Sequence, residues 1–124
     1  MEITNIDQEI TDLFSKAKSI VIVSHIRPDG DAIGSMLGLA NALRLAGKDV
    51  QTVLQDPVPE RFINLPGANL VGNLIKGNPD LAVVVDSSDP NRVGNVFGSR
   101  KPDLVIDHHM TNLNFGKLNL VDSD

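Results

Sequence analysis

Three short, uninterrupted apolar runs most constrain what this chain of 124 residues can fold into. Residues 19–24 read SIVIVS, residues 81–85 read LAVVV and residues 104–106 read LVI. Runs of this length without polar alternation are typical of strands that are buried on both faces, as in a parallel sheet. The sequence therefore predicts a core built on a mostly parallel β-sheet.

Helical segments alternate with these strands. Apolar residues recur at helical spacing over residues 4–18 and 31–46, and Gly47 is a natural stop for the second helix. The remaining expectations are strands at residues 50–54 and 117–121, a loop with one short helix at residues 56–79, and a short helix at residues 91–98. The alternation predicts an α/β fold for residues 1–124, with a three-layer αβα arrangement around the sheet.

Potential metal ligands directly follow the three apolar runs. His25 follows the first run with Asp29 and Asp31 close behind, Asp86 follows the second, and residues 107–109 (Asp-His-His) follow the third. In an open parallel sheet, ligands bind in the crevice beyond the carboxyl ends of the strands. We therefore expect all three histidines of the chain and four of its aspartates to meet at one edge of the sheet.

Carboxylates and neutral imidazoles in this combination suit Mn²⁺, Mg²⁺, Zn²⁺ or Fe²⁺. Four carboxylates gathered together would repel one another, and two divalent cations would offset their charge. Two metal ions about 3.5–4 Å apart are a common arrangement for attack on phosphorus. Asp86 stands alone at its strand end, so it is the natural candidate for a carboxylate that bridges the two metals.

Each of these residues also has a structural interpretation. Asp31 opens a predicted helix and could serve only as its cap. His108 and His109 could be structural histidines. Residues 86–89 (Asp-Ser-Ser-Asp) could form the phosphoacceptor loop of a receiver-like fold, but that interpretation leaves all three histidines unexplained.

The same residues resemble the motifs of a known enzyme family. Residues 24–35 (SHIRPDGDAIGS) look like the first motif of the DHH superfamily of phosphoesterases. Val85 and Asp86 resemble its second motif, and residues 107–109 resemble the third, which gives the superfamily its name. Their order and spacing also fit, over nearly the whole chain. The resemblance implies a hydrolase that acts on phosphoester bonds.

The first motif is similar to that of the nano-RNase/pAp-phosphatase branch, as are Thr111 and Asn112 after the DHH residues. RecJ-type single-strand exonucleases carry a run of aspartates in place of the histidine, and family II inorganic pyrophosphatases typically have Thr between the two aspartates. The implied substrates are very short RNA oligonucleotides, linear or cyclic dinucleotides, and 3′-phosphoadenosine 5′-phosphate (pAp).

The resemblance also implies a role for each metal ligand. His25 and Asp29 would hold one divalent cation, Asp31 and His108 would hold the other, and Asp86 would bridge the two. Mn²⁺ is the expected metal, with Mg²⁺ or Co²⁺ as alternatives. A water or hydroxide between the metals, its pKa lowered by them, would attack phosphorus.

Other residues of the motifs receive roles in the same way. His109 would face the scissile phosphate and stabilise its developing charge, and Asp107 would orient the adjacent histidines. Arg27 would either contact a substrate phosphate or lie exposed on the surface. Gly30 and Gly34 are expected to permit a tight turn and close packing of the helix against a strand.

Two features of the family are missing from the sequence. Members carry a fourth-motif aspartate several tens of residues after the DHH residues, and Asp122 and Asp124 are too close to His109 to be assigned to it. Members also have a C-terminal substrate-binding domain. We therefore expect residues 1–124 to be the N-terminal part of a DHH catalytic domain, with a weak second metal site and little activity alone.

The charge of the chain bears on its substrate. Eleven basic and sixteen acidic residues give a net charge of −5. The chain has four phenylalanines and neither tryptophan nor tyrosine. Long duplex DNA is therefore an unfavourable partner, because duplex binding usually needs a basic surface. Since four of the acidic residues belong to the expected metal site, the acidity is compatible with small phosphorylated substrates.

Several other functions stay open at this point. They are an inorganic pyrophosphatase or polyphosphatase, a RecJ-type single-strand exonuclease, an inactive regulatory domain that binds nucleotides, and a fragment that forms a homodimer through its sheet edge. The sequence shows neither an apolar run long enough to cross a membrane nor a signal peptide. The lack of cysteine fits a cytoplasmic location and excludes thiolate metal sites.

Overall fold

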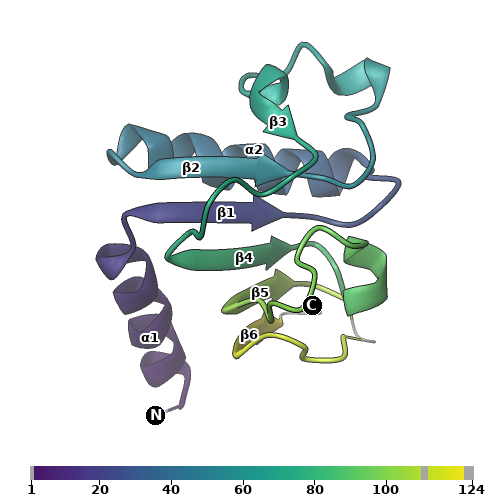
Figure 1. The fold of residues 1–124 in the computed structure, drawn as a ribbon. Coiled ribbons are helices and arrows are strands. Elements are labelled where there is room, and N and C mark those ends of the chain that lie inside the picture. The colour runs from purple at the N-terminus through teal and green to yellow at the C-terminus, as the bar shows by residue number, and fades with distance from the viewer. Residues whose placement is uncertain (1, 110–111, 122–124) are drawn as a thin grey trace.

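A computed structural model describes residues 2–109 and 112–121, in which helices and strands alternate around one sheet (Figure 1). These residues form two α-helices, α1 (Glu2–Lys16) and α2 (Gly30–Leu45). The same ranges contain six strands: β1 (Ser19–Val23), β2 (Asp49–Val53), β3 (Val71–Gly72), β4 (Leu81–Val85), β5 (Leu104–Asp107) and β6 (Leu118–Val121). Three 3₁₀-helices lie in the described connections: η1 (Glu60–Phe62), η2 (Ala68–Leu70) and η3 (Pro90–Val93).

Most of the predicted elements are confirmed. Both long helices and all five predicted strands begin and end within two residues of their expected bounds. The predicted loop at residues 56–79 holds η1, η2 and the short strand β3 instead of one helix. The predicted helix at residues 91–98 is wrong in extent, because η3 ends at Val93, where Gly94 follows with a φ of 83° that no right-handed helix can continue.

The sheet is parallel throughout, with the strand order β3-β2-β1-β4-β5-β6. The chain therefore builds outwards from β1 in one direction and from β4 in the other. β1 and β4 are neighbours at the point where the direction reverses, which is the topological switch point of a doubly wound sheet. The connections that leave the carboxyl ends of these two strands diverge there, and such a crevice is where open α/β sheets bind ligands.

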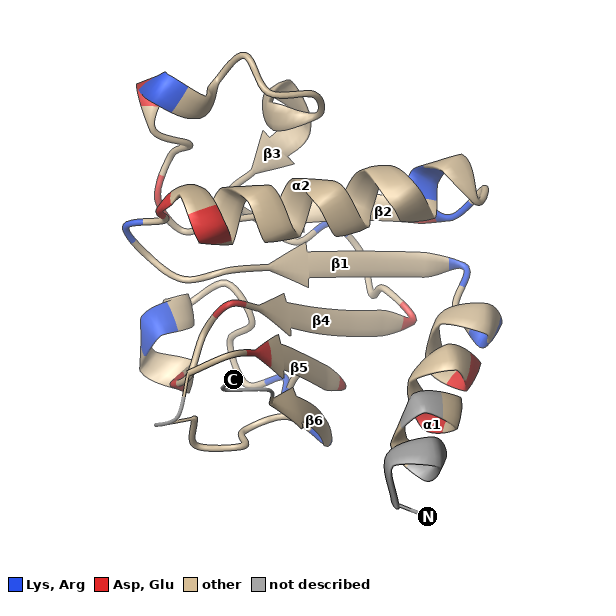
Figure 2. Ribbon diagram, turned by 180° about the vertical axis from the view of Figure 1, so that it is seen from behind, with Lys and Arg blue, Asp and Glu red and all other residues tan. Residues whose placement is uncertain are grey.

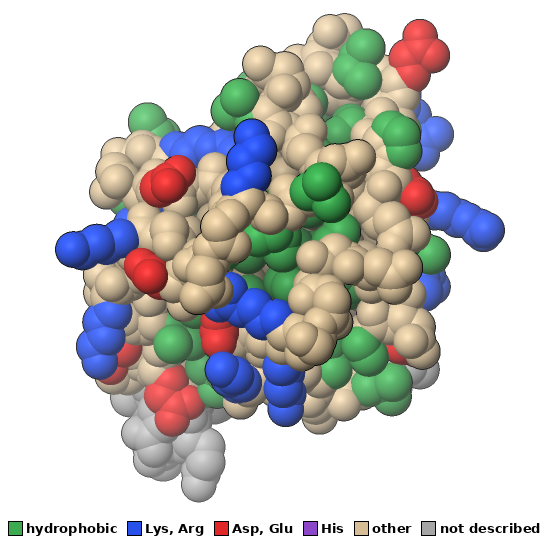
Figure 3. Space-filling model, viewed as in Figure 1, with side chains coloured by type: hydrophobic (Ala, Val, Ile, Leu, Met, Phe, Trp, Pro, Cys, Tyr) green, Lys and Arg blue, Asp and Glu red, His purple; other side chains and the backbone are tan. Residues whose placement is uncertain are grey.

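The two faces of the sheet are covered differently. Figure 2 shows α2 lying across one face, and both α-helices pack on the apolar residues of that face, which include Ile20, Ile22, Leu81, Val83 and Val85. The opposite face is seen in Figure 3, with hydrophobic side chains between irregular segments; residues packed there include Val21, Val23, Val84, Val93 and Phe97. In the described residues, one outer layer is thus α-helical and the other is made of η3 and loops.

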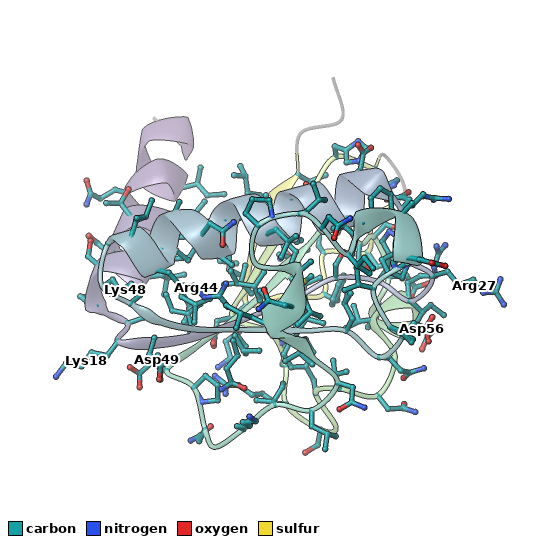
Figure 4. The ribbon with its side chains drawn as sticks, turned by 90° about the horizontal axis from the view of Figure 1, so that it is seen from above. Lys18, Arg27, Arg44, Lys48, Asp49 and Asp56 are labelled. Carbon is teal, nitrogen blue, oxygen red and sulfur yellow. The ribbon has the colours of Figure 1, made fainter. Side chains whose placement is uncertain are left out.

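The amino ends of the strands are closed by hydrogen bonds to the backbone. The Asp80 carboxylate, directly before β4, accepts from the N–H groups of Lys18 (2.9 Å) and Ser19 (3.2 Å). The Lys48 ammonium donates to two carbonyl oxygens near the end of α1, at 3.1 and 2.8 Å. Figure 4 shows Lys48 at this end of the sheet and Arg27 at the other. Polar groups at the amino end are therefore occupied in holding the elements together.

None of the described helices has both the length and the apolar character needed to cross a membrane.

Candidate metal centre

The first ligand is carried by the loop that follows β1. Ser24 and His25 are both buried there, and the Ser24 hydroxyl donates a hydrogen bond to the carbonyl oxygen of Val85 at the end of β4 (2.8 Å). His25 Nδ1 lies 2.7 Å from the carbonyl oxygen of Ile26. Because a carbonyl oxygen can only accept, we assign the imidazole proton to Nδ1, which leaves a lone pair on Nε2 for a metal ion.

Asp29 begins α2 as its N-cap. Its carboxylate accepts a hydrogen bond from the backbone N–H of Ala32 at 2.9 Å. This hydrogen bond lowers the pKa of Asp29; burial has a smaller opposing effect and the nearby His25 adds to the lowering. The same carboxylate oxygen lies 3.8 Å from Nε2 of His25. The helix start therefore holds an ionised carboxylate beside the metal-binding nitrogen of His25.

Asp86 follows β4 and lies between two histidines. Its φ is 56°, a left-handed conformation that Asp adopts more readily than most residues, and its side chain is 5% exposed. One carboxylate oxygen is 2.8 Å from Nε2 of His108 and the other is 3.6 Å from Nε2 of His25. Burial raises the pKa of Asp86, and the hydrogen bond from His108 only partly opposes it. A cationic partner would stabilise the ionised form of this buried carboxylate.

The end of β5 carries a second histidine–carboxylate pair. Oδ1 of the buried Asp107 lies 2.5 Å from Nδ1 of His109, and Oδ2 accepts from the side-chain amide of Asn112 at 2.8 Å. Burial raises the pKa of Asp107, but the hydrogen bonds from Asn112 and His109 outweigh it, so the pKa is lowered. The ionised carboxylate keeps the proton on Nδ1 of His109 and fixes the orientation of its ring. The ring of His108 lies 4.4 Å away, centroid to centroid.

These side chains form two groups of potential metal ligands among the described residues. One group is His25, Asp29 and Asp86, and the other is Asp86, Asp107, His108 and His109. Within each group, ligand atoms lie within 4.8 Å of one another. Asp86 belongs to both groups and directs one oxygen towards a histidine of each. Carboxylate oxygens and imidazole nitrogens are donors that divalent cations of the Mn²⁺ and Zn²⁺ type accept, so the residues present fit such ions.

Two pockets flank Asp86. The polar one has a volume of about 220 Å³ and is lined by His25, Asp29, Asp86, Ser87, Ser88, Arg92 and His109. The other has a volume of about 380 Å³ and is lined by the apolar side chains of Leu39, Val85 and Ile106 together with Ser35, Asp86, Asp107 and His108. Each face of the Asp86 carboxylate thus adjoins a space that solvent or a ligand can enter.

Comparison with known proteins places this centre in a family. Residues 19–123 match the family described as DHH family, N-terminal domain. The chain belongs to the DHH family. The predicted membership is therefore confirmed, and Asp107, His108 and His109 are the residues that spell the family name.

Two curated relatives of this DHH chain carry the same name. The bifunctional oligoribonuclease and PAP phosphatase NrnA of Thermus thermophilus is 42% identical over 107 residues, which are 83% of this chain and 32% of that protein. The protein of the same name from Mycoplasma genitalium is 34% identical over 99 residues, or 73% of this chain and 30% of its own length. The chain therefore spans about a third of the length of these relatives.

A solved structure shows the same fold. An exopolyphosphatase-related protein from Bacteroides fragilis superposes with a TM-score of 0.86 at 26% sequence identity. The superposition covers 97% of this chain and 39% of the other. The predicted α/β fold with a parallel sheet is confirmed by this likeness and by the strand pairing itself.

The DHH fold brings six of the seven predicted site residues into the two ligand groups. The seventh, Asp31, lies in the first turn of α2 with its side chain exposed, and it belongs to neither group. Asp31 lies two residues after Asp29, which is the N-cap of α2. The assignment of Asp31 as a ligand stays a prediction.

Other expectations are resolved by the structure. The Arg27 side chain points outwards from the loop (Figure 4), while its backbone N–H donates to Asp56 (2.8 Å), so it is exposed. The close packing expected at Gly34 is wrong, because a Cβ there would meet no atom within 4 Å. At Gly30 a Cβ would make an ordinary contact with Phe62, 3.6 Å away. Thr111, Asp122 and Asp124 lie outside the described residues.

Sequence reasoning missed three contributors to the centre. Ser24 joins the ends of β1 and β4, Asn112 holds the second oxygen of Asp107, and Arg92 lines the polar pocket. Asn112 had drawn notice only as a marker of the family branch. Ser24 has no local signal of its role, since its partner Val85 is 61 positions away in the chain. Asn112 is only five residues from Asp107 and Arg92 only six from Asp86, but their residue types alone do not show these roles.

Proposed function

We propose that this protein hydrolyses phosphoester bonds in short oligoribonucleotides and in pAp, using two divalent cations held at the carboxyl edge of the sheet. The observation that carries the proposal is the buried Asp86 carboxylate, which directs one oxygen to His25 and the other to His108. The named activities of the two NrnA relatives support the choice of substrates.

Five residues are the proposed ligands, four from the two groups described above and Asp31. His25 and Asp29 would hold one cation, Asp31 and His108 would hold the other, and Asp86 would be shared. Mn²⁺ is the proposed metal, because carboxylate and imidazole ligands suit it and no thiolate is available. When bound, the two cations supply an activated water and positive charge at the phosphate.

The remaining residues of the centre orient the ring of His109 and stabilise charge on the phosphate. The Asp107 carboxylate holds the proton on Nδ1 of His109, so that Nε2 of the same ring is left to act in the polar pocket. We assign His109 to the charge that develops on the phosphate, because it is the histidine that lines this pocket without contacting Asp86. Asn112 keeps Asp107 ionised by donating to its second oxygen.

Short substrates are proposed in preference to long duplexes. The chain has a net charge of −5, and duplex binding depends on neutralising many phosphates with basic side chains. The polar pocket of about 220 Å³ suits one phosphate group and its immediate surroundings rather than a long nucleic acid track.

A second candidate function is hydrolysis of inorganic pyrophosphate or polyphosphate. It is favoured by the likeness to the exopolyphosphatase-related protein of Bacteroides fragilis. Both functions need the same metal centre, so the distinction depends on what binds beside the reacting phosphate.

The test compares substrates on the complete gene product with Mn²⁺. We expect nucleotide release from the dinucleotide pApA and phosphate release from pAp, abolished by EDTA, and no phosphate release from pyrophosphate or polyphosphate. The reverse pattern would establish the second candidate. Binding of Mn²⁺ and pAp without turnover of any of these substrates would instead identify a nucleotide-binding domain.

A further inference from the structure

The side chains of the five arginines of the chain divide into those with a partner and those without. The Arg44 guanidinium donates to the Val50 carbonyl oxygen, Arg61 lies over the ring of Phe62, and Arg100 donates to Asp103 and Asn78. Neither Arg27 nor Arg92 forms a side-chain hydrogen bond or ion pair within the described ranges 2–109 and 112–121. Of these two, Arg92 lines the polar pocket beside Asp86, and Arg27 points outwards (Figure 4).

Arg92 stands on a firmly held turn. It belongs to η3, whose start is capped by Asp89: the carboxylate accepts from the N–H of Asn91 at 2.8 Å and the carbonyl oxygen accepts from the N–H of Arg92 at 3.0 Å. The Arg92 carbonyl oxygen in turn accepts from the N–H of Ile26, next to His25, at 2.5 Å. The backbone of Arg92 is thereby tied to the loop that carries the first metal ligands.

The charge around Arg92 is unusual for an arginine near carboxylates. Asp29 and Asp86 line the same pocket, yet neither lies within 4.0 Å of the Arg92 guanidinium among the described ion pairs. The carboxylates are directed towards His25 and His108 instead. The guanidinium therefore keeps all of its N–H donors available, in a pocket where metal ions would occupy the carboxylates.

We propose that Arg92 is a substrate-binding residue that donates hydrogen bonds to the non-bridging oxygens of the phosphate held in the polar pocket. The proposal rests on the proposed function, and it names the group in the substrate that Arg92 recognises. A guanidinium matches phosphate oxygens with two parallel N–H donors and stays charged at any working pH. The hydrogen bond from Ile26 holds the backbone of Arg92 beside the metal loop, so that the guanidinium can reach a phosphate bound in the polar pocket.

A purely structural Arg92 would behave differently. In that case its side chain would matter no more than that of Arg27, since both are exposed and neither has an internal partner. The two arginines therefore form a matched pair in one protein, with the same chemistry and different positions relative to the pocket.

The experiment measures the dissociation constant of inorganic phosphate by calorimetry, in the presence of saturating Mn²⁺, for the complete gene product and for Arg92→Gln, Arg92→Lys and Arg27→Gln. Inorganic phosphate is the probe because it is not turned over.

We expect Arg92→Gln to weaken phosphate binding about 10- to 100-fold, since a hydrogen bond to a charged group is lost. Arg92→Lys should recover part of the loss, and Arg27→Gln should match the unsubstituted protein. The dissociation constant of Mn²⁺ alone should change less than about two-fold in all three variants, because Arg92 is no metal ligand.

The outcomes separate this proposal from the proposed function. Phosphate binding within about two-fold of the unsubstituted protein in Arg92→Gln, an equal loss in Arg27→Gln, or no phosphate binding by the unsubstituted protein would each overturn the role of Arg92. Failure to hydrolyse pApA and pAp, with phosphate binding still dependent on Arg92, would instead overturn the proposed reaction and leave the phosphate site in place. Loss of Mn²⁺ binding in Arg92→Gln would show that the residue acts through the metal loop, which also contradicts the proposal.

Discussion

Two aspartates flank β4, and their surroundings are opposite. Asp80 lies directly before the strand and Asp86 directly after it (Figure 2). Asp80 is exposed, and its pKa is lowered by hydrogen bonds from the backbone N–H groups of Lys18 and Ser19. Asp86 is buried, its pKa is raised by burial, and its side-chain partners are His25 and His108. An aspartate therefore binds backbone N–H groups at one end of β4 and contacts histidine side chains at the other.

The two ends of the sheet therefore use charged side chains for different purposes. At the amino end of the sheet, carboxylate and ammonium groups are matched to backbone donors and acceptors, so they stabilise the elements that meet there. At the carboxyl end, the backbone of β4 is paired with β5. The carboxylate of Asp86 is hydrogen-bonded to the side chain of His108, and a metal ion could replace that hydrogen bond. The predictions below test this contrast.

Replacing Asp86 should have the largest effect. Asp86→Asn removes the carboxylate shared by both ligand groups, so we expect hydrolysis of pAp to fall by about 100-fold or more, beyond what loss of an outer-shell partner costs. The free energy of unfolding of the metal-free variant should not fall, because a buried carboxyl with a raised pKa is replaced by a neutral amide. Initial rates and urea titrations measure the two effects.

Asp80→Asn is the matched control for that substitution. It should bind Mn²⁺ and hydrolyse pAp at the unsubstituted rate, because Asp80 lies at the opposite end of β4. Equal losses of activity in the two variants would mean that the contrast between the two strand ends is not functional.

The pair formed by Asp107 and His109 should give the next largest effect. In Asp107→Asn the new amide cannot accept from both His109 and Asn112, since one of its two polar atoms is a donor. We expect the turnover rate to fall about 10- to 100-fold with Mn²⁺ affinity altered far less. The Nδ1 proton of His109, followed by NMR, should lose the downfield shift of a charge-assisted hydrogen bond. An unchanged proton signal would show that Asp107 does not orient the ring.

Ser24 should have a smaller effect, on stability. The substitution Ser24→Ala leaves the buried carbonyl oxygen of Val85 without its side-chain donor, at a cost of about 1–3 kcal/mol in the free energy of unfolding. Ser15→Ala, at an exposed position in α1, is the control and should change it by less than about 0.5 kcal/mol. Denaturant unfolding of both variants makes the comparison. If the two variants were equally stable, the hydrogen bond between the ends of β1 and β4 would contribute nothing.

The smallest expected effect is on the pH dependence of the free energy of unfolding when Asp80 is replaced. Its folded pKa is lower than the ordinary value of 3.8, so its contribution is present above pH 3.8 and is lost as the pH falls through the lower folded pKa. Asp80→Asn should therefore unfold at a lower denaturant concentration than the unsubstituted protein near pH 6, and the two should unfold at the same concentration once the pH is below the lowered pKa of Asp80. Parallel curves over the whole range would contradict the lowered pKa.

Much of the fold could be predicted because its signals are local. The apolar runs of β1 and β4 and the helical periodicity of α2 are properties of consecutive residues, and their bounds were found within two residues. The short strand β3 could not be predicted, because two residues with no pattern of their own become a strand only by pairing with β2. The extent of η3 was missed for a related reason, since the positive φ of Gly94 is set by the turn around it.

The site divides in the same way. The residue types and their places after three strands predicted which side chains gather, and His25, Asp86 and His108 do so. The sequence did not show that Arg92 rather than Arg27 lines the polar pocket, although Arg27 lies within the first motif. Arg27 is close in sequence to the metal ligands His25 and Asp29, but its side chain points away from the centre (Figure 4). Its backbone has the left-handed conformation, with a φ of 50°.

A buried parallel sheet with histidines and aspartates at its strand ends could be predicted from the sequence alone, since both features depend on the order of residues along short segments. Which of these side chains share a centre depends on the tertiary structure. The strand order places β1 beside β4, so that residues 61 positions apart, Ser24 and Val85, are hydrogen-bonded, and Asp86 comes between His25 and His108. Contacts of this kind follow from the pairing of whole strands, and no single segment of the sequence carries that information.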